Sequence, residues 1–256
     1  MRSESAWALR TSLLEFLIES AEKLQVTPIV KYTALSFFAD RFYPCLSRFT
    51  SSNKVTNWLL KPLRESNMQL FALVSIWISS KIHDSCPLNV KSLKSLGDAV
   101  IKEQHFTTRD FLEAELILMQ VMDFDIGAGN IAFIFLEDLL FQLKGVAKVG
   151  DLVNFEVSMD VMDLLYEKEE TSTLYSSPHS LAASVLVASY LITVPRQSLE
   201  FPILPWGSEV YCSSKITLSL LLIGIPLISE WYNIHRLIVH SKRSVVPLFG
   251  NMKWDY

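Results

Sequence analysis

The sequence is poor in glycine and carries no excess of positive charge. Only 8 of the 256 residues are glycine, and long stretches repeat their apolar residues at helical spacing, so we expect an all-α protein. Lysine and arginine number 23 against 27 acidic residues, which gives a formal net charge of −4. A protein that binds a phosphate backbone needs a basic surface. We therefore expect no nucleic-acid partner.

Cysteine is scarce as well, and no secretory or membrane segment is apparent. Cys45, Cys86 and Cys212 are far apart, odd in number and not at metal-ligand spacing, which favours a reducing compartment. The first residues contain no apolar signal region. The apolar run 216–228 is shorter than the roughly 20 residues that a bilayer helix needs. We expect an intracellular protein of the nucleus, the cytoplasm or both, without a membrane partner.

Signatures of catalysis are also missing from the sequence. No glycine-rich phosphate loop and no nucleophile motif occurs. The histidines pair with no cysteine or acid at ligand spacing; they are His83, His105, His179, His235 and His240. These absences predict that the chain is not an enzyme and that it uses no metal and no cofactor.

The most informative stretch that is present spans residues 67–84. Its apolar residues recur at the spacing of one helix face, and they are Leu70, Leu73, Val74, Trp77 and Ile78. The pattern predicts a central helix. Lys81 prolongs the same face at the C-terminal end, where the helix dipole favours a cation.

The remaining pattern predicts further helices on both sides of this one. Expected helices cover residues 6–24, 28–42, 89–102, 108–122, 131–143, 155–167 and 178–190. The polar, serine-rich residues 47–57 are expected to form a loop. Thr107 and Asp110 have the spacing of a capping box, with aspartate in place of the usual glutamate or glutamine.

Glu115 is unusual because it lies in the middle of an apolar helix stripe. That stripe consists of Leu112, Leu116, Met119 and Met122. A carboxylate in such a position is costly unless it is paired. Taken alone, the pattern allows two interpretations: Lys81 and Glu115 neutralise each other at the edge of a core, or they bind another molecule.

Several of these stretches resemble the cyclin family. Residues 67–84, with Met68-Gln69-Leu70 and Ser80-Lys81, are similar to the third helix of the cyclin box, although His83-Asp84 replaces an acidic pair. Asp40-Arg41-Phe42 resembles the end of the second helix, and Glu115 begins a stretch similar to the end of the fifth. Among subfamilies, the chain looks most similar to the plant J-type cyclins.

The resemblance implies a cyclin fold of two tandem helical repeats. Residues 1–126 would form the N-terminal cyclin box and residues 127–206 a second repeat that is diverged or incomplete. Beyond 206 the resemblance stops, and we interpret residues 207–256 as an alternative or aberrant C-terminal tail.

The resemblance also implies a function. A cyclin is the regulatory, activating subunit of a cyclin-dependent protein kinase in cell-cycle control, and Lys81 and Glu115 fall on the positions that hold the kinase's regulatory helix. The alternative is a cyclin-fold transcription adaptor that binds proteins or DNA without a kinase. Its DNA-binding form requires a basic face, whereas residues 1–206 carry a net charge of −6.

Two further sets of residues match family positions. Many cyclins dock kinase substrates or inhibitors on an exposed patch, which here would comprise Leu9, Leu13, Glu15, Phe16 and Gln69. Ser12 and Phe16 depart from the usual residues, and we favour the alternative that the apolar members are core. For Asp40, Arg41 and Phe42 we favour a structural role, in which Arg41 ties helices together.

Overall fold

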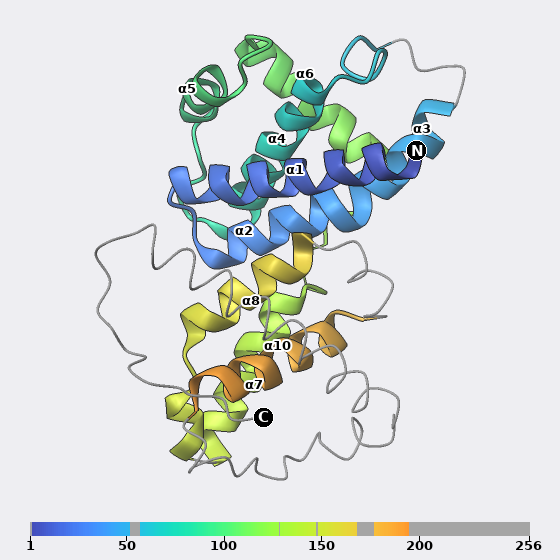
Figure 1. The fold of residues 1–256 in the computed structure, drawn as a ribbon. Helices are drawn as coiled ribbons and strands as arrows, with labels where there is room; N and C mark the ends of the chain where they lie inside the picture. The colour runs from blue at the N-terminus through green and yellow to red at the C-terminus, as the bar shows by residue number, and fades with distance from the viewer. Residues whose placement is uncertain (1, 52–56, 128, 147, 168–176, 195–256) are drawn as a thin grey trace.

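In the computed structural model the described residues are 2–51, 57–127, 129–146, 148–167 and 177–194. Within these ranges the chain is helical and contains no strand, which confirms the predicted all-α class (Figure 1). The tail that we predicted over residues 207–256 lies outside the described residues, as does the end of the predicted second repeat.

The helices form two groups that follow each other along the chain. The first group contains α1 (Arg2–Lys23), α2 (Pro28–Leu35), the π-helical turn η1 (Ser36–Phe42), α3 (Tyr43–Ser51), α4 (Glu65–His83), α5 (Val90–Val100) and α6 (Thr108–Val121). The second contains α7 (Ala132–Val146), the 3₁₀ turn η2 (Lys148–Leu152), α8 (Phe155–Glu167) and α10 (Pro178–Thr193). The helix bounds agree closely with those expected from the sequence, apart from the region around α3.

Helix α4 is the centre of the first group, as predicted. It packs against α1, α2, α5 and α6, and every residue from 71 to 80 is buried. Within the buried run 71–80 the hydroxyls bond to backbone carbonyls: Ser75 Oγ donates to Phe71 O at 2.9 Å, and Ser79 Oγ donates to Val30 O at 2.7 Å. Because these polar groups are satisfied, the helix can be enclosed on all sides.

The expected helix starts are present at α2 and α6. Pro28 occupies the first turn of α2, where the missing N–H of proline is tolerated. At α6, Thr107 Oγ1 accepts from the Asp110 N–H at 3.3 Å, and the Asp110 carboxylate accepts from the Thr107 N–H at 2.6 Å. The predicted capping box is therefore confirmed, with aspartate able to complete it.

The predicted loop over residues 47–57 is wrong in its first part, because the chain stays helical to Ser51. Leu46 is buried and Phe49 packs against the core, so α3 is held in place by apolar contacts. Thr50 Oγ1 also donates to Leu46 O at 2.9 Å. The polar composition indicated a loop, but these side chains can satisfy themselves on a helix whose other face is buried.

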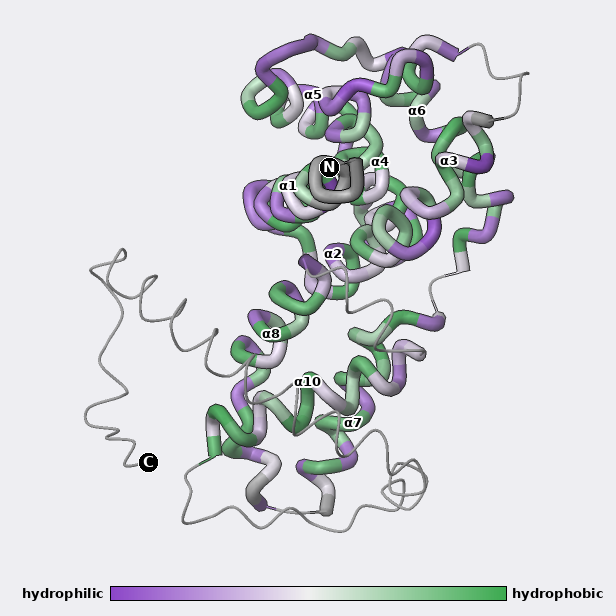
Figure 2. Tube along the Cα trace, turned by 45° about the vertical axis from the view of Figure 1, so that its right-hand side comes forward, coloured by the Kyte–Doolittle hydropathy of each residue, from purple (hydrophilic) through white to green (hydrophobic). Residues whose placement is uncertain are grey.

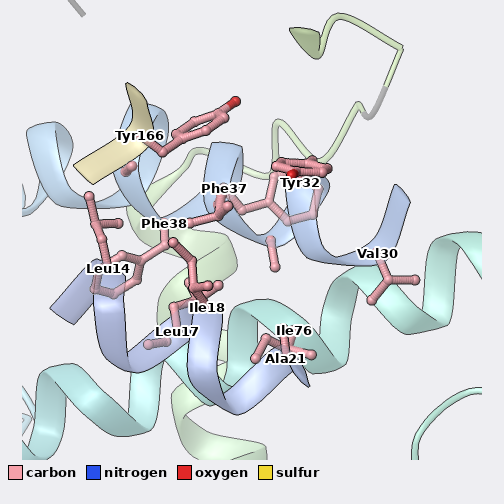
Figure 3. Packing of buried hydrophobic residues seen from close by; sticks show 14 of the residues in the cluster. Leu14, Leu17, Ile18, Ala21, Val30, Tyr32, Phe37, Phe38, Ile76 and Tyr166 are labelled. Atoms are coloured by element: carbon pink, nitrogen blue, oxygen red, sulfur yellow. The ribbon is translucent and has the colours of Figure 1, made fainter. Parts of the chain in front are cut away.

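The second group packs against α1 and α2. The side chains of Lys31 on α2 and Asp163 on α8 form an ion pair of 2.7 Å and are only 13% and 17% exposed. Tyr32 Oη donates to Met159 O at 3.0 Å, and the Tyr32 ring stacks on Phe133 with ring centroids 5.1 Å apart. Figure 3 shows Tyr32 close to the buried side chains of the first group. A continuous core thus joins both groups.

Hydropathy follows this packing. Hydrophobic and hydrophilic residues alternate along the helices, as expected when one side of each helix faces the core (Figure 2). Tyr166 of α8 lies near Phe37 and Phe38 in the close-up of that core (Figure 3). The contact between the groups therefore combines apolar packing with the Lys31–Asp163 pair.

The Lys31–Asp163 pair generates a stability prediction. The substitution Lys31→Met leaves the Asp163 carboxylate without its partner in a mostly buried place, and we expect the free energy of unfolding to fall by about 3 kcal/mol. Urea unfolding of the full chain measures this loss. The double variant Lys31→Met with Asp163→Leu should recover most of it, because no lone charge remains. A loss below about 1 kcal/mol in the single variant would contradict the prediction.

Candidate functional site

The structure brings Lys81 and Glu115 together, although they are far apart in the sequence. Lys81 Nζ lies 2.6 Å from Glu115 Oε1, so the ammonium donates to the carboxylate. Lys81 belongs to the last turn of α4, and Glu115 belongs to α6. Their side chains are 37% and 15% exposed, which places the pair at the surface where the two helices meet.

The packing of α6 on α4 explains this pairing. The buried residues of α6 are Phe111, Ala114, Ile117, Leu118 and Val121. Ala114 is small and fully buried, which allows a close approach between the helices. Because Glu115 follows Ala114 directly, its side chain emerges beside the contact, next to the end of α4. The register of the apolar face therefore sets the position of the carboxylate.

Both charged groups keep hydrogen-bonding capacity beyond their mutual bond. An ammonium has three N–H donors, of which the bond to Glu115 uses one. A carboxylate has two oxygens, and the same bond engages Oε1. The pair can therefore offer donors and an acceptor to another chain without separating.

Exposed apolar side chains lie near Lys81 and Glu115 along α4 and α6, and their exposure corrects one sequence prediction. Leu112 and Leu116 were predicted to lie on the same face as Met119 and Met122, yet they are 54% and 48% exposed. Helix α6 has apolar residues on its buried side and on its exposed side. The stripe identified from the sequence spacing includes residues of the exposed side. Ile82, adjacent to Lys81, is 40% exposed and was not singled out from the sequence. Charges flanked by exposed apolar groups are typical of a protein-binding surface.

His83 lies beside this site and bonds across to α2. Its Nε2 is 2.9 Å from Thr33 Oγ1. Partial burial lowers the pKa of His83 below its usual value, while the charge of Asp84 acts in the opposite direction. Burial thus favours the neutral form of this imidazole.

Arg41 contacts the segment that connects the two groups of helices. Its Nη1 donates to Asp125 O at 2.8 Å and its Nη2 donates to Gly127 O at 2.7 Å. The guanidinium also lies 3.4 Å from the Asp125 carboxylate. Phe42 is fully buried, with its ring centroid 4.8 Å from that of Phe71, whereas Asp40 is exposed. These contacts agree with a structural role for Arg41. They connect η1 to the segment between the two groups and not to another helix.

The residues predicted for substrate docking are distributed between core and surface. Leu13 is fully buried, and Leu9 and Phe16 pack partly against the core. Glu15 is exposed, and Gln69 of α4 is partly buried. Leu13 therefore belongs to the core, while the partly exposed members leave docking as a prediction.

Metal-binding clusters and membrane-spanning helices are both absent from the described residues. Within them, no group of three or more histidine, cysteine, aspartate and glutamate side chains is placed to hold a metal ion. Nor does any helix in those ranges have the length and apolar character needed to cross a bilayer.

Comparisons with known proteins agree with the fold. The family described as "Cyclin, N-terminal domain" matches residues 1–127. The chain is 62% identical over 202 residues to Cyclin-J18 of Arabidopsis thaliana, covering 79% of this chain and 86% of that protein. It is 54% identical over 211 residues to Cyclin-J18-like of Oryza sativa subsp. japonica, covering 79% and 81%.

A solved structure shows the same architecture. A viral cyclin from herpesvirus saimiri superposes with a TM-score of 0.60 at 18% identity, covering 90% of this chain and 88% of the viral one. The chain belongs to the cyclin family, and it has the cyclin fold. The predicted likeness to plant J-type cyclins is also confirmed. Family and fold together support a regulatory role of the cyclin type.

The partial exposure of the Lys81–Glu115 pair leads to a second stability prediction. Glu115→Ala should change the free energy of unfolding by about 1 kcal/mol or less, because the remaining ammonium can turn toward water. Urea unfolding, run beside Lys31→Met, measures the difference between the two ion pairs. A loss above about 2 kcal/mol would favour the alternative that Lys81 and Glu115 only neutralise each other in the fold.

Proposed function

We propose that this cyclin is the regulatory, activating subunit of a cyclin-dependent protein kinase in cell-cycle control. The observation that carries the proposal is the Lys81–Glu115 ion pair of 2.6 Å at the surface junction of α4 and α6. It falls on residues that the family resemblance assigns to kinase binding. The exposed apolar side chains around it supply the second component of a binding surface.

The pair would bind the main chain of the kinase. The N–H groups of Lys81 donate to backbone carbonyls, and the Glu115 carboxylate accepts from backbone N–H groups. Such bonds recognise the course of a backbone, at the kinase helix that carries the catalytic glutamate and in the loop before it. Because both groups are charged, these bonds are stronger than those between neutral partners.

Apolar contacts beside the pair would contribute affinity. Ile82, Leu112 and Leu116 expose 40%, 54% and 48% of their surface, and a partner that covers them removes apolar area from water. Covering the same side chains also excludes water from the pair, which strengthens its bonds to the partner. The ion pair and its apolar surroundings thus act together.

Activation follows from the states that the kinase can adopt. A protein kinase is competent when its strand lysine pairs with the helix glutamate and its activation loop is in place. A cyclin that binds only the conformation with that helix turned inward increases its population. The cyclin would therefore activate the enzyme without contributing a catalytic group.

Docking of kinase substrates or inhibitors is a further part of the proposal. Leu9 and Phe16 on α1, together with Gln69 on α4, are partly exposed, and Glu15 adds an acid at the surface. A segment with a leucine and a basic residue would match this chemistry. We expect the complex of this cyclin with its kinase to act in the nucleus, the cytoplasm or both.

Substitution of the ion pair tests the proposed function. Lys81→Ala or Glu115→Ala should weaken kinase binding by about 2 to 5 kcal/mol, or about 30-fold to 5000-fold in Kd, since a desolvated charge loses its partner. Calorimetry with a panel of purified cyclin-dependent kinases from Arabidopsis thaliana measures binding, and histone phosphorylation measures activation.

A matched control is available on α5. Lys94 forms an ion pair with Asp98, and its side chain is 39% exposed, close to the 37% of Lys81. Lys94→Ala should leave kinase binding within about twofold of the original chain, because loss of an exposed pair has little effect. Unchanged binding in the Lys81→Ala, Glu115→Ala double variant would rule out binding of the kinase through the Lys81–Glu115 pair. Binding to no kinase of the panel would favour the transcription adaptor.

A further inference from the structure

Trp77 lies one helical turn before Lys81 and meets its ammonium group. Lys81 Nζ is 3.5 Å from the centroid of the Trp77 ring, within the range of a cation–π interaction. The indole is only 6% exposed. The Lys81 ammonium is therefore in contact with two groups, the face of the indole and the carboxylate of Glu115.

The indole is itself fixed by hydrogen bonds. Trp77 Nε1 donates to Leu88 O at 2.9 Å. The Leu88 N–H donates to Ser80 Oγ at 3.2 Å, and Ser80 Oγ donates to Trp77 O at 2.8 Å. Rotation of the ring would break its bond to the Leu88 carbonyl. The ring face presented to Lys81 is thus held by the segment that follows α4.

A fixed ring matters because a lysine side chain is flexible. Ordering such a side chain at an interface costs conformational entropy at the moment of binding. Two attractive contacts that already restrain the ammonium in the free protein reduce that cost. The ring leaves the remaining N–H groups of Lys81 available, since the face of an indole attracts the charge without using a hydrogen-bond acceptor.

From this geometry we propose that Trp77 is a positioning residue for Lys81. It holds the ammonium beside Glu115 in the orientation that meets the partner's backbone. The inference rests on the proposed kinase-binding function and names a residue on which that function depends. A leucine at position 77 would keep an apolar side chain in part of the same buried space, but it would offer no aromatic face to the cation and no donor to Leu88 O.

Binding measurements on combined variants test the proposal. The kinase is the one of the panel that binds the original chain, and the variants are Trp77→Leu, Trp77→Phe, Lys81→Met and Trp77→Leu with Lys81→Met. Trp77→Leu should raise Kd by about two- to fivefold, and Trp77→Phe by less, because phenylalanine keeps an aromatic face. In the Lys81→Met background, Trp77→Leu should cause no further loss.

A second measurement needs no kinase. Reductive ¹³C-methylation of the full chain keeps the lysine charge, and NMR then reports the surroundings of each dimethylated amine. The Lys81 resonance, assigned by its absence in Lys81→Met, should be shifted upfield by the indole. The shift should disappear in Trp77→Leu and remain in part in Trp77→Phe. If Trp77→Leu does not fold, Trp77→Met replaces it in both measurements.

The outcomes distinguish a failure of the inference about Trp77 from a failure of the proposed kinase-binding function. One contrary result is that Trp77→Leu reduces the affinity for the kinase equally in the original chain and in the Lys81→Met background, and another is that it leaves the Lys81 resonance unmoved. Either result would show that Trp77 only fills the core and would overturn the inference. Unchanged kinase binding in Lys81→Met would instead contradict the proposed function, in which Lys81 binds the kinase backbone. In that case the NMR shift would still establish whether Trp77 holds the ammonium.

Discussion

The enclosure of α4 is the constraint on which the rest of the structure depends. Every residue from 71 to 80 is buried, so the helix must satisfy its polar side chains internally and can present charge only at its ends. Its serines bond to nearby carbonyls, and Lys81 is the first exposed residue after the buried run. The surrounding helices therefore determine where that lysine emerges. A change in their packing would move the ammonium as well.

Helix α6 shows how one packing contact can prepare a binding surface. Its buried face fixes it against α4, and Glu115 extends from the border of that face. Next to Glu115, on the side of α6 that faces away from the core, Leu112 and Leu116 remain exposed. The same helix thus supplies the carboxylate and the apolar side chains of the proposed kinase surface. The exposure of these apolar side chains fits the binding role proposed for this surface.

Local signals in the sequence predicted the helices well. Thr107 with Asp110 marks a helix start by its own chemistry, and the spacing in residues 67–84 predicts α4 directly. The extension of α3 to Ser51 was missed because burial of Leu46 outweighs a polar composition. Periodicity also chose the wrong side of α6, since it identifies apolar stripes without saying which one is covered.

Residues that meet across the fold were harder to predict. The direct pairing of Lys81 with Glu115 was one of two interpretations that the residue pattern left open, and the cyclin resemblance implied only that both residues bind the same partner. Spacing along one helix cannot identify a partner on another. The bonds from Arg41 to Asp125 O and Gly127 O had no signal in the sequence, since main-chain carbonyls are acceptors at any residue. The fold is therefore more predictable than the site, which is built from contacts between elements.

Two lysine–carboxylate pairs in this chain differ in burial, and this difference suits one to stabilising the fold and the other to binding a partner. Lys31–Asp163 and Lys81–Glu115 have nearly equal lengths, 2.7 and 2.6 Å. The first lies between helices of different groups, and both of its side chains are mostly covered. In the second the lysine is 37% exposed and is restrained by an indole on one side, so hydrogen-bonding capacity remains directed outward. The same chemistry thus stabilises the fold in one place and is available to a partner in the other.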